Sequence, residues 1–113
     1  MAEERNVTAR PGGTPEAEID AWRRRIDQID TQLMGLLNSR SACAVEIGRI
    51  KRALGLPVYS PEREAWILDR VMRENPGPLD PLAVRRVFER IIDESRRLER
   101  LAGEREAENG ERK

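Results

Sequence analysis

A long amphipathic helix, predicted from Thr14 to Leu54, constrains the fold of this chain more than any other feature. Its apolar residues recur at the i, i+3, i+4, i+7 spacing of one buried helical face: Ile19, Trp22, Ile26, Ile29, Leu33, Leu37, Ala44 and Ile47. At about 100° per residue, Arg40 and Lys51 lie within about 40° of the middle of this stripe, and Arg23 lies on its flank. Because a buried charge without a partner is costly, the pattern indicates that an anion meets these cations.

Three helix starts are indicated by an N-cap residue followed directly by proline: Thr14-Pro15, Ser60-Pro61 and Asp80-Pro81. Gly55 followed by Pro57 ends the first helix, whereas the second is predicted to reach about Glu74 and the third about Leu101. No segment alternates with period two over a useful length. The predicted fold class is therefore all-α, with three helices of very unequal length.

The chain divides into three parts by composition. Residues 1–13 are polar and rich in Gly, Pro and charge, so we expect a disordered N-terminal arm; residues 14–102 form the helical domain, and 103–113 a disordered C-terminal tail. A first helix of about 40 residues is about 60 Å long, and two shorter helices cannot cover its stripe. We therefore expect a homodimer.

Composition excludes several classes of function. Of 113 residues, 38% are hydrophobic and 37% charged, which leaves little material for a self-sufficient core and favours a small helical oligomer. The net charge is zero and no basic tract suggests a nucleic-acid surface. No apolar run has membrane-spanning length and the N-terminus does not resemble a signal peptide, so we expect a cytoplasmic protein. The single cysteine, Cys43, excludes an intramolecular disulfide.

The chain contains no histidine, which narrows the chemistry available to it. A Ser-His-Asp or Cys-His nucleophile, a histidine general base and a histidine metal site are all excluded. Catalysis must rest on carboxylates, lysine, arginine and hydroxyls. A pocket lined by arginine and lysine suits electrostatic stabilisation better than proton transfer.

Polar residues face inwards on all three predicted helices. The third helix continues the apolar face of Val84 and Ile92 with polar groups, and the second carries an Arg-Glu pair one turn before Ile67. The full inward-facing polar set is Arg23, Arg40, Lys51, Arg63, Glu64, Ser95 and Glu99. Any one of them could snorkel or form an interhelical salt bridge. Together, four cations with two acids favour a site for a polyanionic small molecule.

Segments on all three helices resemble the all-α chorismate mutases. The resemblance rests on Arg23, Asp30, Leu36–Arg40, Val45–Lys51, Pro57–Glu64 and Phe88–Ser95, and it covers about residues 16–102. It implies an intertwined dimer of three-helix protomers with two active sites. Each site would convert chorismate to prephenate by a Claisen rearrangement, toward phenylalanine and tyrosine, with no metal and no cofactor.

The resemblance also implies roles for the cations. Arg40 would bind one substrate carboxylate, and Arg23 would reach the other carboxylate from the second protomer. Lys51 would contact a carboxylate and the ether oxygen. Arg63 would help to order the start of the second helix.

The remaining implied roles belong to acids and hydroxyls. Glu64 would accept a hydrogen bond from the ring hydroxyl, Ser95 would line the carboxylate pocket, and Glu99 would face the ether oxygen. Glu99 would have to be protonated, because a carboxylate there would repel the developing charge. Ser60 stands where many members of the family have an acid, which keeps an N-cap but alters a contact near the ring hydroxyl.

Other functions remain open from the sequence. Isochorismate-pyruvate lyases and 4-amino-4-deoxychorismate mutases share this fold and act on similar dianions. A helical module that regulates a shikimate-pathway synthase is an alternative from a different class, and such a synthase is a possible partner. A purely structural coiled-coil dimer is the fourth; it predicts that removing Arg40 or Lys51 is neutral or stabilising.

Overall fold

The computed structural model describes residues 13–111 of the chain. The described part contains three helices and no strand: α2 (Pro15–Ala53), α3 (Pro61–Glu74) and α4 (Pro81–Glu111). The all-α prediction is therefore confirmed. Residues 13–38 and residues 39–111 form two separate units, and each is considered by itself. The predicted disordered arm, apart from Gly13, lies outside the described residues.

The predicted caps begin the helices as expected. The Thr14 side chain accepts a hydrogen bond from Ala17 N at 3.1 Å, and the Asp80 carboxylate accepts one from Ala83 N at 2.8 Å. Each bond satisfies one of the backbone N–H groups that a helix start leaves without a partner. Short-range chemistry alone fixes these boundaries, so the sequence was sufficient to place them.

The end of α2 is a glycine turn. Gly55 has a φ of +71°, in the left-handed region that residues with a Cβ rarely enter. Gly55 N donates to Arg52 O at 3.1 Å and Leu56 N donates to Lys51 O at 2.8 Å. These two bonds form a Schellman motif, which satisfies the last carbonyls of the helix and turns the chain toward α3.

The end of α4 differs from the prediction. The helix continues to Glu111, so both the predicted end near Leu101 and the disordered tail from residue 103 are wrong for the residues described. Within the added turns, Arg52 of α2 pairs with Glu106 at 2.9 Å. No local sequence pattern predicts an ion pair between residues so far apart in the chain.

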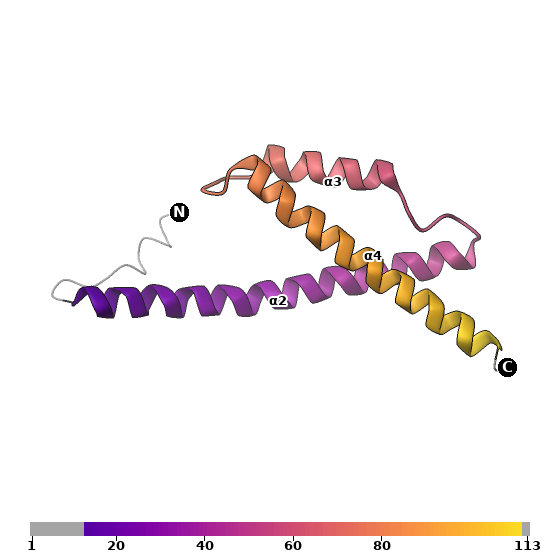
Figure 1. Cartoon of the computed structure of the whole chain (residues 1–113), viewed down its shortest axis with the longest axis horizontal. Helices are drawn as coiled ribbons and strands as arrows, with labels where there is room; N and C mark the ends of the chain where they lie inside the picture. The colour runs from indigo at the N-terminus through magenta and orange to yellow at the C-terminus, as the bar shows by residue number, and fades with distance from the viewer. Residues whose placement is uncertain (1–12, 112–113) are drawn as a thin grey trace. The chain divides into compact units, whose positions relative to one another are not determined.

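The interior of the unit formed by residues 39–111 is small. α3 and α4 pack against each other at the end where the loop 75–80 joins them (Figure 1). Among the described hydrophobic residues only Val84 and Ile92 are buried, and the buried polar residue Ser95 follows Ile92 by one helical turn. The α4 face predicted from its periodicity is therefore the one that packs inwards. No helix within residues 13–111 is long and apolar enough to cross a membrane.

The unit formed by residues 13–38 leaves its apolar stripe uncovered. Ile19, Ile26 and Leu33 are 49%, 54% and 48% exposed. The mutual spacing of these residues puts their side chains on one face of α2. A stripe of this kind is normally buried against another helix.

Candidate functional site

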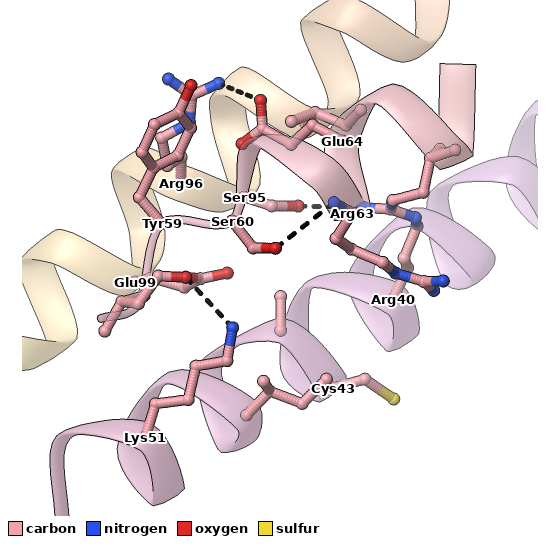
Figure 2. Close-up of a pocket in the computed structure, with 15 residues that line it drawn as sticks. Arg40, Cys43, Lys51, Tyr59, Ser60, Arg63, Glu64, Ser95, Arg96 and Glu99 are labelled. Carbon is pink, nitrogen blue, oxygen red and sulfur yellow. Dashed lines mark hydrogen bonds and ion pairs between the residues drawn. The ribbon is translucent and has the colours of Figure 1, made fainter. Parts of the chain in front are cut away.

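Most of the polar residues predicted to face inwards surround one pocket within residues 39–111 (Figure 2). The pocket has a volume of about 230 Å³ and is lined by all three helices and by the segment 58–60. The predicted site residues that line it are Arg40, Lys51, Ser60, Arg63, Glu64, Ser95 and Glu99. Arg23 is exposed, belongs to the unit of residues 13–38, and does not line this pocket.

Arg40 is held by a neutral partner. Its Nη1 donates to Ser95 Oγ at 3.3 Å, and Ser95 is only 6% exposed. Figure 2 shows the two side chains approaching each other from α2 and α4. A guanidinium has five N–H donors, so this bond orients Arg40 and leaves donors for an anion in the pocket.

Lys51 is also held by a neutral partner. Its Nζ donates to the backbone oxygen of Val58 at 3.3 Å. The glycine turn after α2 brings Val58 back beside the last turn of the helix, so the local fold creates this contact. Since an ammonium group carries three donors, Lys51 also keeps hydrogen-bonding capacity for a ligand.

Glu99 packs closely against α2. A Cβ built on Gly48 would lie 3.5 Å from Glu99 Cγ and 3.6 Å from its Oε2, so the glycine permits this close approach. Burial raises the pKa of the Glu99 carboxyl above its ordinary value, and the charge of Glu64 adds to the rise. The positive charges of Lys51, then Arg52 and Arg96, oppose it without cancelling it. A raised pKa favours the protonated carboxyl, which can donate a hydrogen bond.

The start of α3 supplies a second polar edge of the pocket. Ser60 Oγ accepts a hydrogen bond from Arg63 N at 3.3 Å, which confirms Ser60 as the N-cap. The Arg63 guanidinium lies 4.6 Å from the centre of the Trp66 ring, a cation–π contact that lays the side chain along α3. Ser60 keeps its own hydroxyl hydrogen for a group in the pocket.

Arg96 and Tyr59 line the pocket but were not among the predicted site residues. Arg96 Nη2 donates to Glu64 Oε1 at 2.7 Å, and its guanidinium lies 5.1 Å from the centre of the Tyr59 ring. Arg96 follows Ile92 by four residues, so it flanks the apolar face of α4, and this spacing could have revealed it. Tyr59 lies in a loop, where helical periodicity says nothing.

The pocket as a whole favours a small anion. Its lining contains four cationic and two acidic side chains: Arg40, Lys51, Arg63, Arg96, Glu64 and Glu99. Glu64 is paired with Arg96, and burial raises the pKa of the Glu99 carboxyl above its ordinary value. Within residues 13–111, no group of histidine, cysteine, aspartate or glutamate side chains is placed to hold a metal ion. The chemistry that this lining supplies is electrostatic.

Comparisons with known proteins point in one direction. Residues 22–100 match the family model described as chorismate mutase type II. The bifunctional chorismate mutase/prephenate dehydratase of Pseudomonas aeruginosa is 42% identical over 87 residues, which are 73% of this chain and 24% of that protein. The chorismate mutase of Methanocaldococcus jannaschii is 39% identical over 51 residues, or 45% of this chain and 52% of that one.

A solved structure extends the likeness to the fold. Chorismate mutase (form II) from Thermus thermophilus matches with a TM-score of 0.71 and 38% sequence identity, covering 73% of this chain and 93% of that chain. The present chain spans about a quarter of the length of the bifunctional relatives that it matches.

Proposed function

The chain belongs to the type II chorismate mutase family, and from that membership we propose that it converts chorismate to prephenate, a step of phenylalanine and tyrosine biosynthesis. One observation carries the proposal: Arg40 and Lys51 project into the same pocket, each held by a neutral hydrogen-bond partner. Their charges are therefore available to a dianion. The cytoplasmic location expected from the sequence stays a prediction.

The proposed reaction suits a pocket without a nucleophile. In a Claisen rearrangement the ether C–O bond breaks while a C–C bond forms within the same molecule. No proton, electron pair or group enters or leaves. The protein therefore has to hold a flexible dianion in its compact conformer and to stabilise the negative charge that develops on the ether oxygen.

Arg40 and Lys51 divide the electrostatic work in this proposal. Arg40, oriented by Ser95 at 3.3 Å, binds one carboxylate through its remaining N–H groups. Lys51 contacts a carboxylate and the ether oxygen. Because the charge on that oxygen grows only as the bond breaks, a lysine there binds the transition state more tightly than the substrate.

The acids and hydroxyls orient the other end of the substrate. Protonated Glu99 donates a hydrogen bond to the ether oxygen, and its raised pKa supports this assignment. Glu64, held by Arg96 at 2.7 Å, accepts a hydrogen bond from the ring hydroxyl. Ser60 contacts the same side of the ring, and Arg63 keeps the start of α3 ordered.

We further propose an intertwined homodimer in which Arg23 of one protomer completes the site of the other. The exposed stripe of residues 13–38 supports a second copy, because Ile26 and Leu33 are each about half exposed. Arg23 lies on the same helix, on the flank of that stripe. It would bind the second carboxylate, as the family resemblance implies, and Arg40 would bind the first.

Complementation tests the shared site. Arg23→Ala and Arg40→Ala should each lose most activity as homodimers. A mixed dimer of the two variants contains one intact site and one doubly altered site, so random exchange should restore about a quarter of the wild-type activity. Unfolding and refolding the variants together, with each refolded alone as a control, measures this recovery. Failure to recover activity, with mixed dimers present by native mass spectrometry, would contradict the proposal.

Product analysis separates the competing functions. Purified protein is mixed separately with chorismate, isochorismate and 4-amino-4-deoxychorismate, and the products are identified by NMR. We expect prephenate from chorismate to form fastest. Faster release of pyruvate from isochorismate would instead indicate a lyase, and turnover of none of the three would favour a helical module that regulates a shikimate-pathway synthase.

A further inference from the structure

An arginine outside the pocket joins the last turn of α2 to the C-terminal part of α4. Arg52 donates through Nε to Glu106 Oε2 at 3.1 Å and through Nη2 to Glu106 Oε1 at 2.9 Å. The hydrogen bond from Arg52 lowers the pKa of the Glu106 carboxyl, so the pair is ionised at neutral pH. A bidentate pair of this kind fixes the orientation of both side chains.

Two glycines leave room for the Arg52 side chain between α2 and α4. A Cβ built on Gly48 of α2 would lie 3.2 Å from Arg52 Nη1, and one built on Gly103 of α4 would lie 3.4 Å from its Cδ, Nε and Cζ. Arg52 Nη1 also reaches the backbone oxygen of Glu99 at 3.5 Å. The guanidinium therefore packs against the backbone of both helices, beside the turn that carries Glu99.

We propose that Arg52 is a positioning residue that, with Glu106, holds the segment Glu99–Glu106 of α4 against Gly48 and thereby fixes the Glu99 carboxyl in the pocket. The proposal rests on the proposed function, in which Glu99 contacts the ether oxygen. Arg52 itself does not line the pocket. Its effect on the reaction passes through the position of Glu99.

The electrostatic surroundings of Glu99 make this role measurable. The charged groups that act on it are Lys51 and Arg52 from α2, Glu64 from α3 and Arg96 from α4. After burial, which raises the Glu99 pKa, Lys51 and then Arg52 are the largest influences, and both lower it. Removing the Arg52 charge should therefore raise the Glu99 pKa further, whereas removing only the bidentate geometry should not.

Three variants separate geometry from charge. Arg52→Leu removes both the charge and the bidentate hydrogen bonds, whereas Arg52→Lys keeps the charge but cannot form the bidentate pair. Glu106→Gln keeps Arg52 and removes its anionic partner. Arg49→Leu is the control, because Arg49 lies on the same helix and forms an exposed pair with Glu46 at 2.9 Å. The charge of Arg49 acts weakly on Glu106 but is not among those that act on Glu99. The measurements are amide hydrogen exchange over residues 100–106, the side-chain carboxyl NMR titration of Glu99, and kcat and KM for chorismate against pH.

We expect all three variants to speed exchange over residues 100–106 and to lower kcat by about tenfold to 100-fold with less change in KM, since small misplacement of a group near the reacting atoms has effects of this size. Only Arg52→Leu should raise the Glu99 pKa. Because the proposed reaction needs protonated Glu99, activity should then be lost at a higher pH than in the wild type. If Arg52→Leu does not fold, the exchange rates over residues 100–106 and the kcat of Glu106→Gln are compared with those of the control instead.

Identical exchange rates and Glu99 titrations in Arg52→Leu and Arg49→Leu would overturn the proposal. Exchange and NMR do not depend on turnover. A wild-type protein that leaves chorismate unchanged would thus refute the proposed function, while the role of Arg52 in holding Glu99 would still be decided.

Discussion

Replacing Glu99 with glutamine tests the proposed chemistry at its most sensitive point. Burial raises the pKa of the Glu99 carboxyl, and only the protonated form can donate a hydrogen bond to an ether oxygen. Above that pKa the protonated fraction falls about tenfold for each pH unit. The wild-type kcat/KM should fall with the same slope, whereas glutamine donates at every pH and should give a flat profile.

The same substitution has a consequence for folding stability. A folded-state pKa above the unfolded value of about 4.3 means that the native protein binds the proton more tightly than the unfolded chain does. The stabilising contribution of Glu99 to the free energy of unfolding is fully present below about pH 4.3. It is lost as the pH rises through the folded-state pKa. Glu99→Gln should remove this loss, so the variant should be relatively more stable than the wild type at neutral pH.

Two measurements with one control check the argument. Chorismate turnover is followed from about pH 4.5 to 8.5, and the free energy of unfolding by urea is measured over the same range. Glu94→Gln is the control, because Glu94 lies on α4 in an exposed pair with Arg90 at 2.7 Å. A wild-type kcat/KM that rises steadily through neutral pH, or a Glu99→Gln profile parallel to the wild type, would refute the reasoning.

Three further results are expected. Ser95→Ala should lower kcat/KM about tenfold or more, because a hydrogen bond to a charged group is worth about 1.5–3 kcal/mol; an unchanged rate would contradict the anchoring of Arg40. Ile92→Ala should lower the free energy of unfolding by about 2–5 kcal/mol, measured by urea denaturation, since Ile92 is only 7% exposed. Alkylation of Cys43, the single cysteine, should slow when chorismate occupies the pocket that it lines, and equal rates with and without chorismate would place the substrate elsewhere.

Much of the fold was predictable because its boundaries are local. Thr14, Ser60 and Asp80 each form the cap expected of them, and Gly55 adopts the left-handed conformation that ends α2. Each of these features depends on neighbours within a few residues. The end of α4 was predicted wrongly, and the pairing of Arg52 with Glu106 in its added turns gives no local signal in the sequence.

The site residues likewise divide into those that local helical periodicity predicts and those that it does not. Helical phase found Arg40, Lys51, Ser95 and Glu99, because each continues an apolar face that the structure turns inwards. It did not find Tyr59, which lies in a loop. Two-chain features such as the role of Arg23 depend on an interface, so they stay predictions until the dimer is measured.

The partners of the cations explain how charges can occupy an apolar stripe without closing the site. Arg52 and Arg96 are paired with carboxylates, and those pairs hold helices and side chains in place. Arg40 and Lys51 are instead held by a hydroxyl and a backbone carbonyl, which orient them without neutralising them. An ion pair at either position would offset the positive potential that the proposed dianion needs, so this division between neutral and ionic partners supports the proposed binding site.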